Sequence, residues 1–195
     1  MEEMKEKKNE IRSRVAQQLA ALPETEVSNR TERIENRLFE FANFLEAKIV
    51  LLYLNGSLDV ASRSIIQKSF ELNKIVVLPV LPQESSKLAL LKVDNLDADL
   101  ISDGSGKPAP DPNRCKRVPI DRIDIALIPG VAFDEKGGRI GMGDGFYDRL
   151  IPKLPATTRK VALAFDDQVL PFVPMESHDK HVDIIITEKR VIYKI

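Results

Sequence analysis

Apolar residues recur at helical spacing in the first quarter of the chain. Pro23 ends a first stripe, which consists of Ile11, Val15, Leu19 and Leu22. A second helix is expected to begin at Ser28 or Asn29, because Asn29 is followed three residues later by Glu32, as in a capping box. The expected buried stripe of this second helix is Ile34, Leu38, Phe41 and Leu45.

Continuous apolar runs follow, and such runs are typical of strands that are covered on both faces. A further helix, with Ile65, Ile66 and Phe70 on its buried side, is expected after Ser62. The short stretch 88–93 predicts one more strand, and the alternating stretch 190–195 predicts an edge strand. The buried strands are predicted at 48–54, 74–78, 123–128, 160–165 and 183–187.

Turn-forming residues separate these elements. Asn55-Gly56-Ser57 predicts a turn after the first strand, and Pro79 and Pro82 are expected to end the second. Residues 94–119 are rich in Gly, Pro and Asp, which predicts a long irregular loop.

Strands that alternate with helices predict an α/β fold with a mostly parallel sheet and helices on both faces. The 195 residues are enough for one core, so we expect a single domain over 1–195. Ligands of such sheets bind at the carboxyl ends of the strands. Chemistry is therefore expected in the segments after Leu54, Ile128, Phe165 and Thr187.

The charge balance argues against a large anionic partner. The chain has 29 Lys and Arg residues against 30 Asp and Glu residues, so we expect neither nucleic-acid binding nor attachment to a membrane. The N-terminus has no apolar signal core, and no apolar run approaches the roughly 20 residues of a membrane helix. Cys115 is the single cysteine, which favours a reduced compartment. We expect a cytoplasmic protein, of a size that permits a monomer.

Five of the nine glycines lie between residues 137 and 145, after the predicted strand 123–128. Glycine at 141, 143 and 145 lets backbone N–H groups turn toward one bound group without interference from Cβ atoms. Phe146 and Tyr147 begin a predicted short helix, whose N-terminus adds positive potential. Arg139 supplies a fixed positive charge that is well shaped for phosphate oxygens. The segment predicts a phosphate site, although a surface hairpin with tight turns fits the same composition.

The glycine spacing matches neither common nucleotide-binding motif. The chain has no G-x-x-x-x-G-K-[ST], and Phe146 stands where G-x-G-x-x-G requires glycine. A standard P-loop or dinucleotide-binding fold is therefore not indicated.

Longer motifs carry a family resemblance. Residues 128–134 (Ile-Pro-Gly-Val-Ala-Phe-Asp) and 138–149, with the pattern Gly-Arg-Ile-Gly-x-Gly-x-Gly-x-Tyr-Asp-Arg, resemble the signature of the 5-formyltetrahydrofolate cyclo-ligases. Further similarities in kind and order extend over nearly the whole chain: Lys8, Arg12, Tyr53, 78–79, 162–165, Gln168, 173–174, 178–179 and 183–187. The resemblance implies a fold similar to the ribose-phosphate isomerase and CoA-transferase group.

The resemblance also implies a reaction. ATP would phosphorylate the formyl oxygen of 5-formyltetrahydrofolate, so that a second nitrogen can close onto the formyl carbon and give 5,10-methenyltetrahydrofolate, ADP and phosphate. Arg139 and Tyr147 are the implied catalytic residues. The implied ATP-binding residues are Lys8, Arg12 and 139–147, that is Arg139, Ile140, Gly141, Met142, Gly143, Asp144, Gly145, Phe146 and Tyr147. The implied folate-binding residues are Leu54, Asp59, Gly143, Asp144, Gly145, Phe146 and Tyr147.

Asp148 and Asp179 are the implied Mg²⁺ ligands, and such a sparse pair suffices because Mg²⁺ takes its other ligands from phosphate and water. Taken without the resemblance, Asp148 fits a helix-dipole partner and Asp179 a turn residue. His178 and His181 also fit a zinc pair, but a clear third ligand is missing. Similarly, Lys8 and Arg12, four residues apart, fit a solvated basic helix face.

Three departures from the family pattern concern the substrate contacts. Met142, Asp144 and Phe146 stand where relatives often carry Tyr, Gly and Tyr. Asp59 replaces a usual glutamate, so that a bridging water or a tighter pocket must make up the lost reach. The segment 104–110 replaces a common Gly-Ile-x-Glu-Pro pattern.

Two side chains have more than one interpretation. Phe133 fits either a pocket wall or a buried anchor, and Arg149 fits a salt-bridge partner better than a catalytic group. For the whole chain, the alternatives to the ligase are a non-catalytic folate or nucleotide binder on the same scaffold and, more remotely, a sugar-phosphate isomerase.

Overall fold

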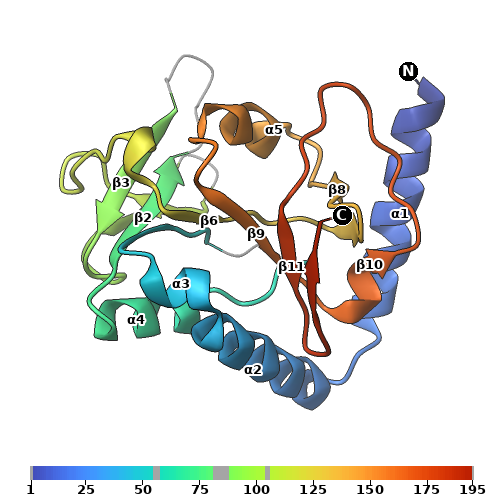
Figure 1. The fold of residues 1–195 in the computed structure, drawn as a ribbon, viewed down its shortest axis with the longest axis horizontal. Coiled ribbons are helices and arrows are strands. Elements are labelled where there is room, and N and C mark those ends of the chain that lie inside the picture. Colours follow the sequence, from blue (N-terminus) through green and yellow to red (C-terminus); the bar gives the residue numbers. More distant parts are fainter. Residues whose placement is uncertain (1, 55–57, 81–87, 104–105, 195) are drawn as a thin grey trace.

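The computed structural model describes residues 2–54, 58–80, 88–103 and 106–194. A seven-stranded sheet forms its centre, in the order β12-β11-β9-β6-β1-β2-β3 (Figure 1). The five inner strands are parallel, and the two edge strands are antiparallel to their neighbours. This confirms the predicted mostly parallel α/β fold. The strands are β1 Ile49–Leu51, β2 Ile75–Val80, β3 Ala89–Val93, β6 Ile125–Leu127, β9 Arg159–Leu163, β11 Ile184–Ile186 and β12 Val191–Tyr193.

Helices cover both faces of this sheet (Figure 1). Three of them, α2 (Glu24–Glu40), α3 (Ala42–Glu46) and α4 (Arg63–Glu71), share one apolar core with one side of the strands. On the other side, α5 (Phe146–Leu150) packs into a second core. The inner strands are apolar on both sides because each side has its own core, which explains their continuous apolar sequence. The described residues also contain three 3₁₀ turns: Ile120–Arg122, Ile151–Lys153 and Asp166–Gln168.

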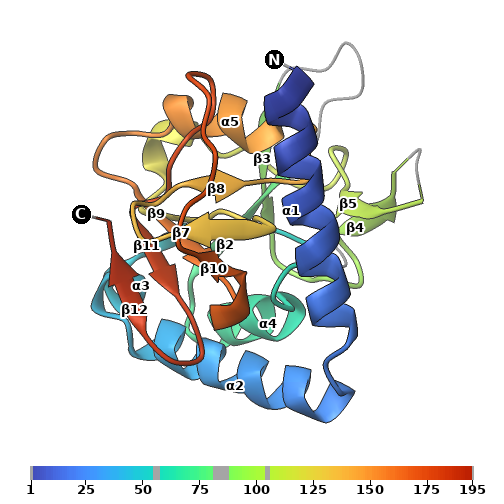
Figure 2. The ribbon, with the colours of Figure 1, turned by 90° about the vertical axis from the view of Figure 1, so that its right-hand side faces the viewer.

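The first helix, α1 (Glu2–Ala20), lies against a second, smaller sheet (Figure 2). That sheet has the order β10-β7-β8 and was not predicted from the sequence. Val15 of α1 packs with β7 and β8 in a third apolar cluster. The short strands place the glycine-rich segment directly beside α1. They are β7 Ala132–Asp134, β8 Arg139–Ile140 and β10 Val169–Leu170.

Two predicted helix features were wrong. The second helix begins at Glu24, directly after Pro23, rather than at Ser28 or Asn29. Phe41 separates α2 from α3, and Leu45 is 52% exposed, so the buried stripe ends before Leu45. Pro23 is itself the N-cap residue: its ring fixes φ, its backbone is extended, and the helix begins directly after it without a side-chain cap. This backbone constraint sets the start of the helix, and the capping-box pattern at Asn29 does not.

Two predicted breaks in regular structure also fall elsewhere. β2 continues through Pro79, because β1 ends opposite Val77 and needs no N–H from the proline. The predicted loop 94–119 contains a hairpin of β4 (Leu100–Ser102) and β5 (Pro108–Pro110). The predicted turn 55–57 and the stop at Pro82 lie outside the described residues.

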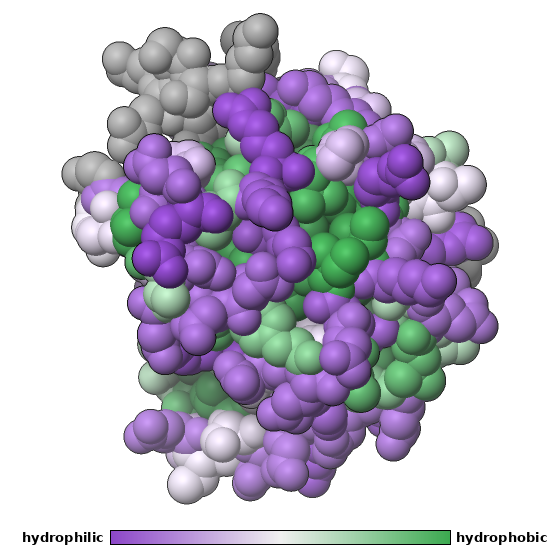
Figure 3. All heavy atoms as spheres, turned by 90° about the vertical axis from the view of Figure 1, so that its left-hand side faces the viewer, coloured by the Kyte–Doolittle hydropathy of each residue, from purple (hydrophilic) through white to green (hydrophobic). Residues whose placement is uncertain are grey.

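The outer edge of β3 is partly covered by the chain itself. Lys92 N–H donates to the Lys116 carbonyl at 2.8 Å, and Val118 N–H donates to the Leu90 carbonyl at 2.9 Å. The surface over this side of the molecule is mixed, with an apolar area framed by hydrophilic residues (Figure 3). Backbone pairing of this kind protects an edge strand from pairing with other chains.

In the described ranges, no helix has the length and apolar character needed to cross a membrane.

We expect the α2 stripe to be a main source of stability. Replacing Leu38, which is fully buried, by alanine should lower the free energy of unfolding by about 2–5 kcal/mol, because it removes apolar contacts and leaves a cavity. Leu45→Ala is the matched control and should change it by less than about 0.5 kcal/mol. Chemical denaturation measures both, and equal effects would contradict the burial pattern.

Candidate functional site

A cavity of about 1770 Å³ opens where parallel strands end. Leu54 after β1, Leu78 to Val80 of β2, and Pro129 and Gly130 after β6 form its floor. Its other walls are α1, the loop 141–145 and the β4–β5 hairpin. The segments after Leu54 and Ile128, where chemistry was predicted, thus line the same cavity. The segments after Phe165 and Thr187 do not line it; Asp166 there forms ion pairs with Lys189 and Arg190 instead.

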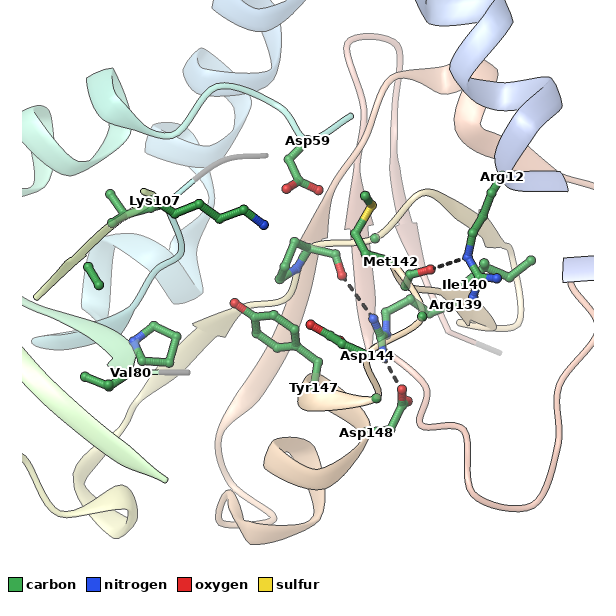
Figure 4. A pocket seen from close by; sticks show the side chains of 18 of the residues that line it. Arg12, Asp59, Val80, Lys107, Arg139, Ile140, Met142, Asp144, Tyr147 and Asp148 are labelled. Atoms are coloured by element: carbon green, nitrogen blue, oxygen red, sulfur yellow. Dashed lines mark hydrogen bonds and ion pairs between the residues drawn. The ribbon is translucent and has the colours of Figure 1, made fainter. Parts of the chain in front are cut away.

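The three predicted phosphate-binding cations, Lys8, Arg12 and Arg139, line this same cavity. Arg12 Nε donates to the Gly141 carbonyl at 2.8 Å, so it lies directly beside the glycine loop (Figure 4). Gly143 also faces Arg12, because a Cβ at Gly143 would lie 3.6 Å from Arg12 Nη2. Lys8 and Arg12 therefore line the cavity and do not form a solvated basic face of the helix.

Arg139 lies beneath the loop and is only 3% exposed. Its Nη2 donates to Asp148 Oδ1 at 2.8 Å, and its Nη1 donates to the Pro129 carbonyl at 3.2 Å (Figure 4). Arg139 Nε is buried and has no hydrogen-bond partner among the described residues. A Cβ at Gly141 would lie 2.7 Å from Arg139 Nη1, so a larger residue at this position would require the guanidinium to shift.

The loop 141–145 bends through left-handed backbone at Gly143 and Gly145, with φ of 106° and 65°. Asp144 Oδ1 accepts the N–H of Phe146 at 3.0 Å, and the Asp144 carbonyl accepts from Arg149 Nη1 at 3.1 Å. Asp144, unexpected beside a phosphate loop, thus fixes the first turn of α5. The partner of Arg149 is a backbone carbonyl and not the expected salt-bridge acid.

Lys8 joins the N-terminal helix to an acidic segment near the other end of the chain. Its ammonium group lies 2.9 Å from Glu176 Oε2 and 2.5 Å from Asp179 Oδ2. Burial lowers the pKa of Lys8, but hydrogen bonds to the two acids outweigh burial and leave the pKa raised. Burial raises the pKa of Asp179, but hydrogen bonds from Lys8 and from the Glu176 N–H leave this pKa below its usual value.

The two predicted metal ligands line the cavity, and each is already paired. Asp148 binds Arg139, and Asp179 binds Lys8. Asp148 also accepts the N–H of Lys180, at 2.9 Å, but it does not belong to the cluster of ligand atoms around Asp179. In the described ranges, Glu176, His178 and Asp179 form the one group whose ligand atoms lie within 4.8 Å of one another. His181 is outside that group, which gives the zinc-pair interpretation no support.

The half of the cavity away from α1 is largely apolar, with Leu54, Val80 and Ile101 among its walls. Asp59 and Tyr147 face it (Figure 4). Burial, followed by the nearby charge of Asp59, raises the pKa of Tyr147, so its hydroxyl stays protonated and can donate a hydrogen bond. Tyr53 donates to the Val60 carbonyl at 3.1 Å and thereby fixes the segment that carries Asp59.

Not every predicted ligand contact is placed at the cavity. The rings of Phe146 and Phe133 are buried in the core beneath the sheet, so neither ring lines the cavity. Phe133 is therefore the buried anchor of the two alternatives. The remaining predicted site residues all line the cavity: Lys8, Arg12, Leu54, Asp59, Arg139, Ile140, Gly141, Met142, Gly143, Asp144, Gly145, Tyr147, Asp148 and Asp179.

Several cavity residues were missed. Glu176 lies three residues before Asp179, and its N–H donates to Asp179 Oδ2 at 2.7 Å; an acid at this spacing was the available signal. Ile101 and Lys107 belong to the hairpin that composition presented as a loop.

Acids outnumber cations in the described cavity wall. The carboxylates are Glu2, Asp59, Asp103, Asp144, Asp148, Glu176 and Asp179, and the cations are Lys5, Lys8, Arg12, Lys107 and Arg139. A divalent cation bound to a triphosphate would lower the repulsion between the phosphates and these acids.

The fold and the site define an α/β protein with one cavity at the carboxyl edge of its sheet, lined by cations and a glycine loop on one side and by apolar side chains on the other. The model of the 5-formyltetrahydrofolate cyclo-ligase family matches residues 4–188, and the chain belongs to that family. It is a ligase that converts 5-formyltetrahydrofolate to 5,10-methenyltetrahydrofolate in an ATP-dependent reaction.

Individual relatives agree over nearly the full length. The chain is 30% identical to the "Probable 5-formyltetrahydrofolate cyclo-ligase" of Caenorhabditis elegans, with 98% of each chain covered. It is 27% identical to the cyclo-ligase of Mycolicibacterium smegmatis, with 94% of each covered. The structure of Aquifex aeolicus 5,10-methenyltetrahydrofolate synthetase superimposes with a TM-score of 0.83 at 30% identity, covering 95% of this chain and 92% of that one.

The Lys8 ion pairs should make stability depend on pH. A lowered Asp179 pKa stabilises the fold above the usual value of 3.8, and a raised Lys8 pKa stabilises it below 10.5. Lys8→Met should therefore lower the free energy of unfolding most between these values, and the loss should shrink as the pH falls through the lowered Asp179 pKa. Denaturation of Lys8→Met at pH 7 and pH 3 measures this. Lys7→Met, which affects an exposed pair with Glu3, is the control and should show little change.

Proposed function

We propose that this chain closes the ring of 5-formyltetrahydrofolate by transferring the terminal phosphoryl group of ATP to the formyl oxygen. The formyl oxygen attacks the terminal phosphorus, and the bond to the bridging oxygen breaks and releases ADP. The second nitrogen then attacks the formyl carbon, the carbon–oxygen bond breaks, phosphate leaves, and the nitrogen gives up its proton. Phosphate leaves readily where an amide-type oxygen does not.

One observation carries the proposal. Lys8, Arg12 and Arg139 meet the bare loop 141–145 in one part of a cavity whose other part is apolar. The first part suits a triphosphate, and the second suits a flat amphipathic ring system. Since phosphoryl transfer depends mainly on positioning and electrostatics, a cavity that holds both ligands side by side supplies what the reaction needs.

In this proposal, Arg139 and Arg12 hold the transferring phosphoryl group against the loop amides. The guanidinium of Arg139 is fixed from two sides, by Asp148 and by the Pro129 carbonyl, so little reorganisation is needed during the reaction. Tyr147, kept protonated, orients the folate by donating a hydrogen bond and does not act as a base.

We further propose that Asp148 and Asp179 hold a magnesium ion, with Glu176 as a neighbouring acid. Carboxylates suit this ion, and the ammonium group of Lys8 already occupies a cation position between Glu176 and Asp179. When bound, magnesium neutralises phosphate charge and orients the terminal phosphoryl group. The surplus of acids in the cavity wall fits a nucleotide that arrives with a divalent cation.

The cytoplasmic location and the monomeric state are also proposals. A relative in Arabidopsis thaliana is named a mitochondrial cyclo-ligase, so the name of one relative already places it in another compartment.

Removing a phosphate-binding cation should slow the reaction. With Mg²⁺ and ATP, Arg12→Ala should lower the rate roughly 10- to 100-fold, because the transferring charge loses one fixed partner. Arg14→Ala changes an exposed arginine of the same helix outside the cavity, and its rate should stay within about twofold. Product formation is followed by its near-ultraviolet absorbance.

The same assay separates the alternatives. Folded wild-type protein that forms no product would reject the ligase. If calorimetry then still showed folate or nucleotide binding, the non-catalytic binder would be favoured. Equal rates of Arg12→Ala and Arg14→Ala would contradict the site.

The metal site can be tested without turnover. Asp148→Asn and Asp179→Asn should each weaken Mn²⁺ binding, measured by calorimetry with a non-hydrolysable ATP analogue, by roughly tenfold or more. Asp97→Asn, which changes an 86% exposed acid outside the cavity, should leave Mn²⁺ binding unchanged. Unaltered affinity in both site variants would place the ion elsewhere.

A further inference from the structure

The β4–β5 hairpin brings a charged side chain into the apolar half of the cavity. Ile101, Pro108 and Ala109 of this hairpin contribute apolar wall, and Lys107 lies at the start of β5. Figure 4 shows the side chain of Lys107 extended across the cavity, with its amino end directed toward Asp59 and the hydroxyl side of Tyr147. Lys107 is exposed, and its side chain is directed into the cavity and not away from the molecule.

The backbone of Lys107 is fixed from both sides. Its N–H donates to Asp103 Oδ1 at 2.9 Å, and its carbonyl accepts the N–H of Asp103 at 2.7 Å. Gly106 precedes it with a φ of +81°, a left-handed conformation that glycine adopts without strain. The following strand β5 packs against β2, which forms the cavity floor. The hairpin thus presents the lysine stem at a defined place on the wall.

Lys107 and Asp59 have complementary chemistry. An ammonium group only donates hydrogen bonds, and an ionised carboxylate only accepts them. The ring system of a folate carries an amino group and a ring N–H beside a carbonyl oxygen on one edge. A carboxylate and an ammonium group that face each other across an apolar slot can bind such an edge, the carboxylate at its donors and the ammonium at its acceptor.

We propose that Lys107 is a specificity-determining residue, whose ammonium group donates to the carbonyl oxygen on the ring edge of the folate. This inference rests on the proposed function, because it concerns the folate of that reaction. The inward direction of the side chain favours the ring over the glutamate carboxylates, since the ring must lie near Asp59 and Tyr147 for the formyl group to reach the phosphate side. Lys107 lies on a hairpin separate from the loop 141–145, so its effect should be confined to the folate.

The test compares Lys107→Met with Lys116→Met, an exposed lysine of the same region that does not line the cavity. Lys107→Met should raise KM for 5-formyltetrahydrofolate about tenfold, which is the lower end for a hydrogen bond to a charged group, because Lys107 is exposed. It should leave KM for ATP within twofold. Lys107→Arg should retain most of the affinity. Lys116→Met should resemble the wild type in both constants. A folate KM within twofold of wild type for Lys107→Met would overturn the proposal.

A second substrate shows whether Lys107 donates to the ring carbonyl of the folate or to a carboxylate of its glutamate tail. 5-Formyltetrahydropteroate keeps the ring and both reacting nitrogens but lacks the glutamate. A tenfold rise in KM for this compound as well supports the ring contact, whereas loss of the effect would overturn it in favour of a tail carboxylate.

Direct binding keeps this inference separate from the proposed function. Calorimetry with 5-formyltetrahydrofolate in the absence of ATP should give a Kd about tenfold higher for Lys107→Met than for wild type. If wild-type protein forms no product but shows this difference in Kd, the proposed reaction fails and the Lys107 contact stands. If product forms and the two Kd values agree, the Lys107 contact fails alone. Equal melting temperatures of the variants would confirm that the hairpin is intact.

Discussion

The site depends on a buried guanidinium group. Arg139 places a positive charge beneath the glycine loop, where an unpaired charge is strongly disfavoured. Asp148 from α5 and the Pro129 carbonyl after β6 compensate that charge, so three elements must meet for Arg139 to be accommodated. Gly141 is part of the same arrangement, because a Cβ there would displace the guanidinium from its present position. The position of the loop, the start of α5 and the end of β6 all follow from this one group.

The sequence was sufficient for the parts of the fold that are governed by burial. Runs such as 123–128 and 183–187 are apolar because helices and a second core cover both sides of the sheet, and a continuous apolar run is a strong signal. The hairpin β4–β5 and the sheet β10-β7-β8 were missed because their strands have only two or three residues and, unlike the equally short β1, β6 and β11, do not lie in a longer uninterrupted apolar run. At that length neither alternation nor propensity is distinguishable from a loop.

The residues of the site could be named largely from the family motif, but their pairing could not. Lys8 and Asp179 were each assigned to a ligand, yet the structure joins them to one another, since residues 171 apart meet only through the fold. Phe146 shows the opposite case: it lies within the motif, but the turn at Gly145 directs its ring into the core. The near-neutral total charge likewise gave no sign that acids outnumber cations around the cavity, because a sum over the chain contains no spatial information.

The contact of Lys8 with Glu176 and Asp179 has a consequence for biosynthesis. A ribosome releases the N-terminal helix early, whereas its acidic partners emerge only after most of the chain has been made. Until then, the ammonium group lacks these two counter-charges, and the cavity wall that α1 provides lacks this anchor. A chain truncated before Glu176 therefore loses both contacts, although five of the seven strands of the central sheet precede the truncation.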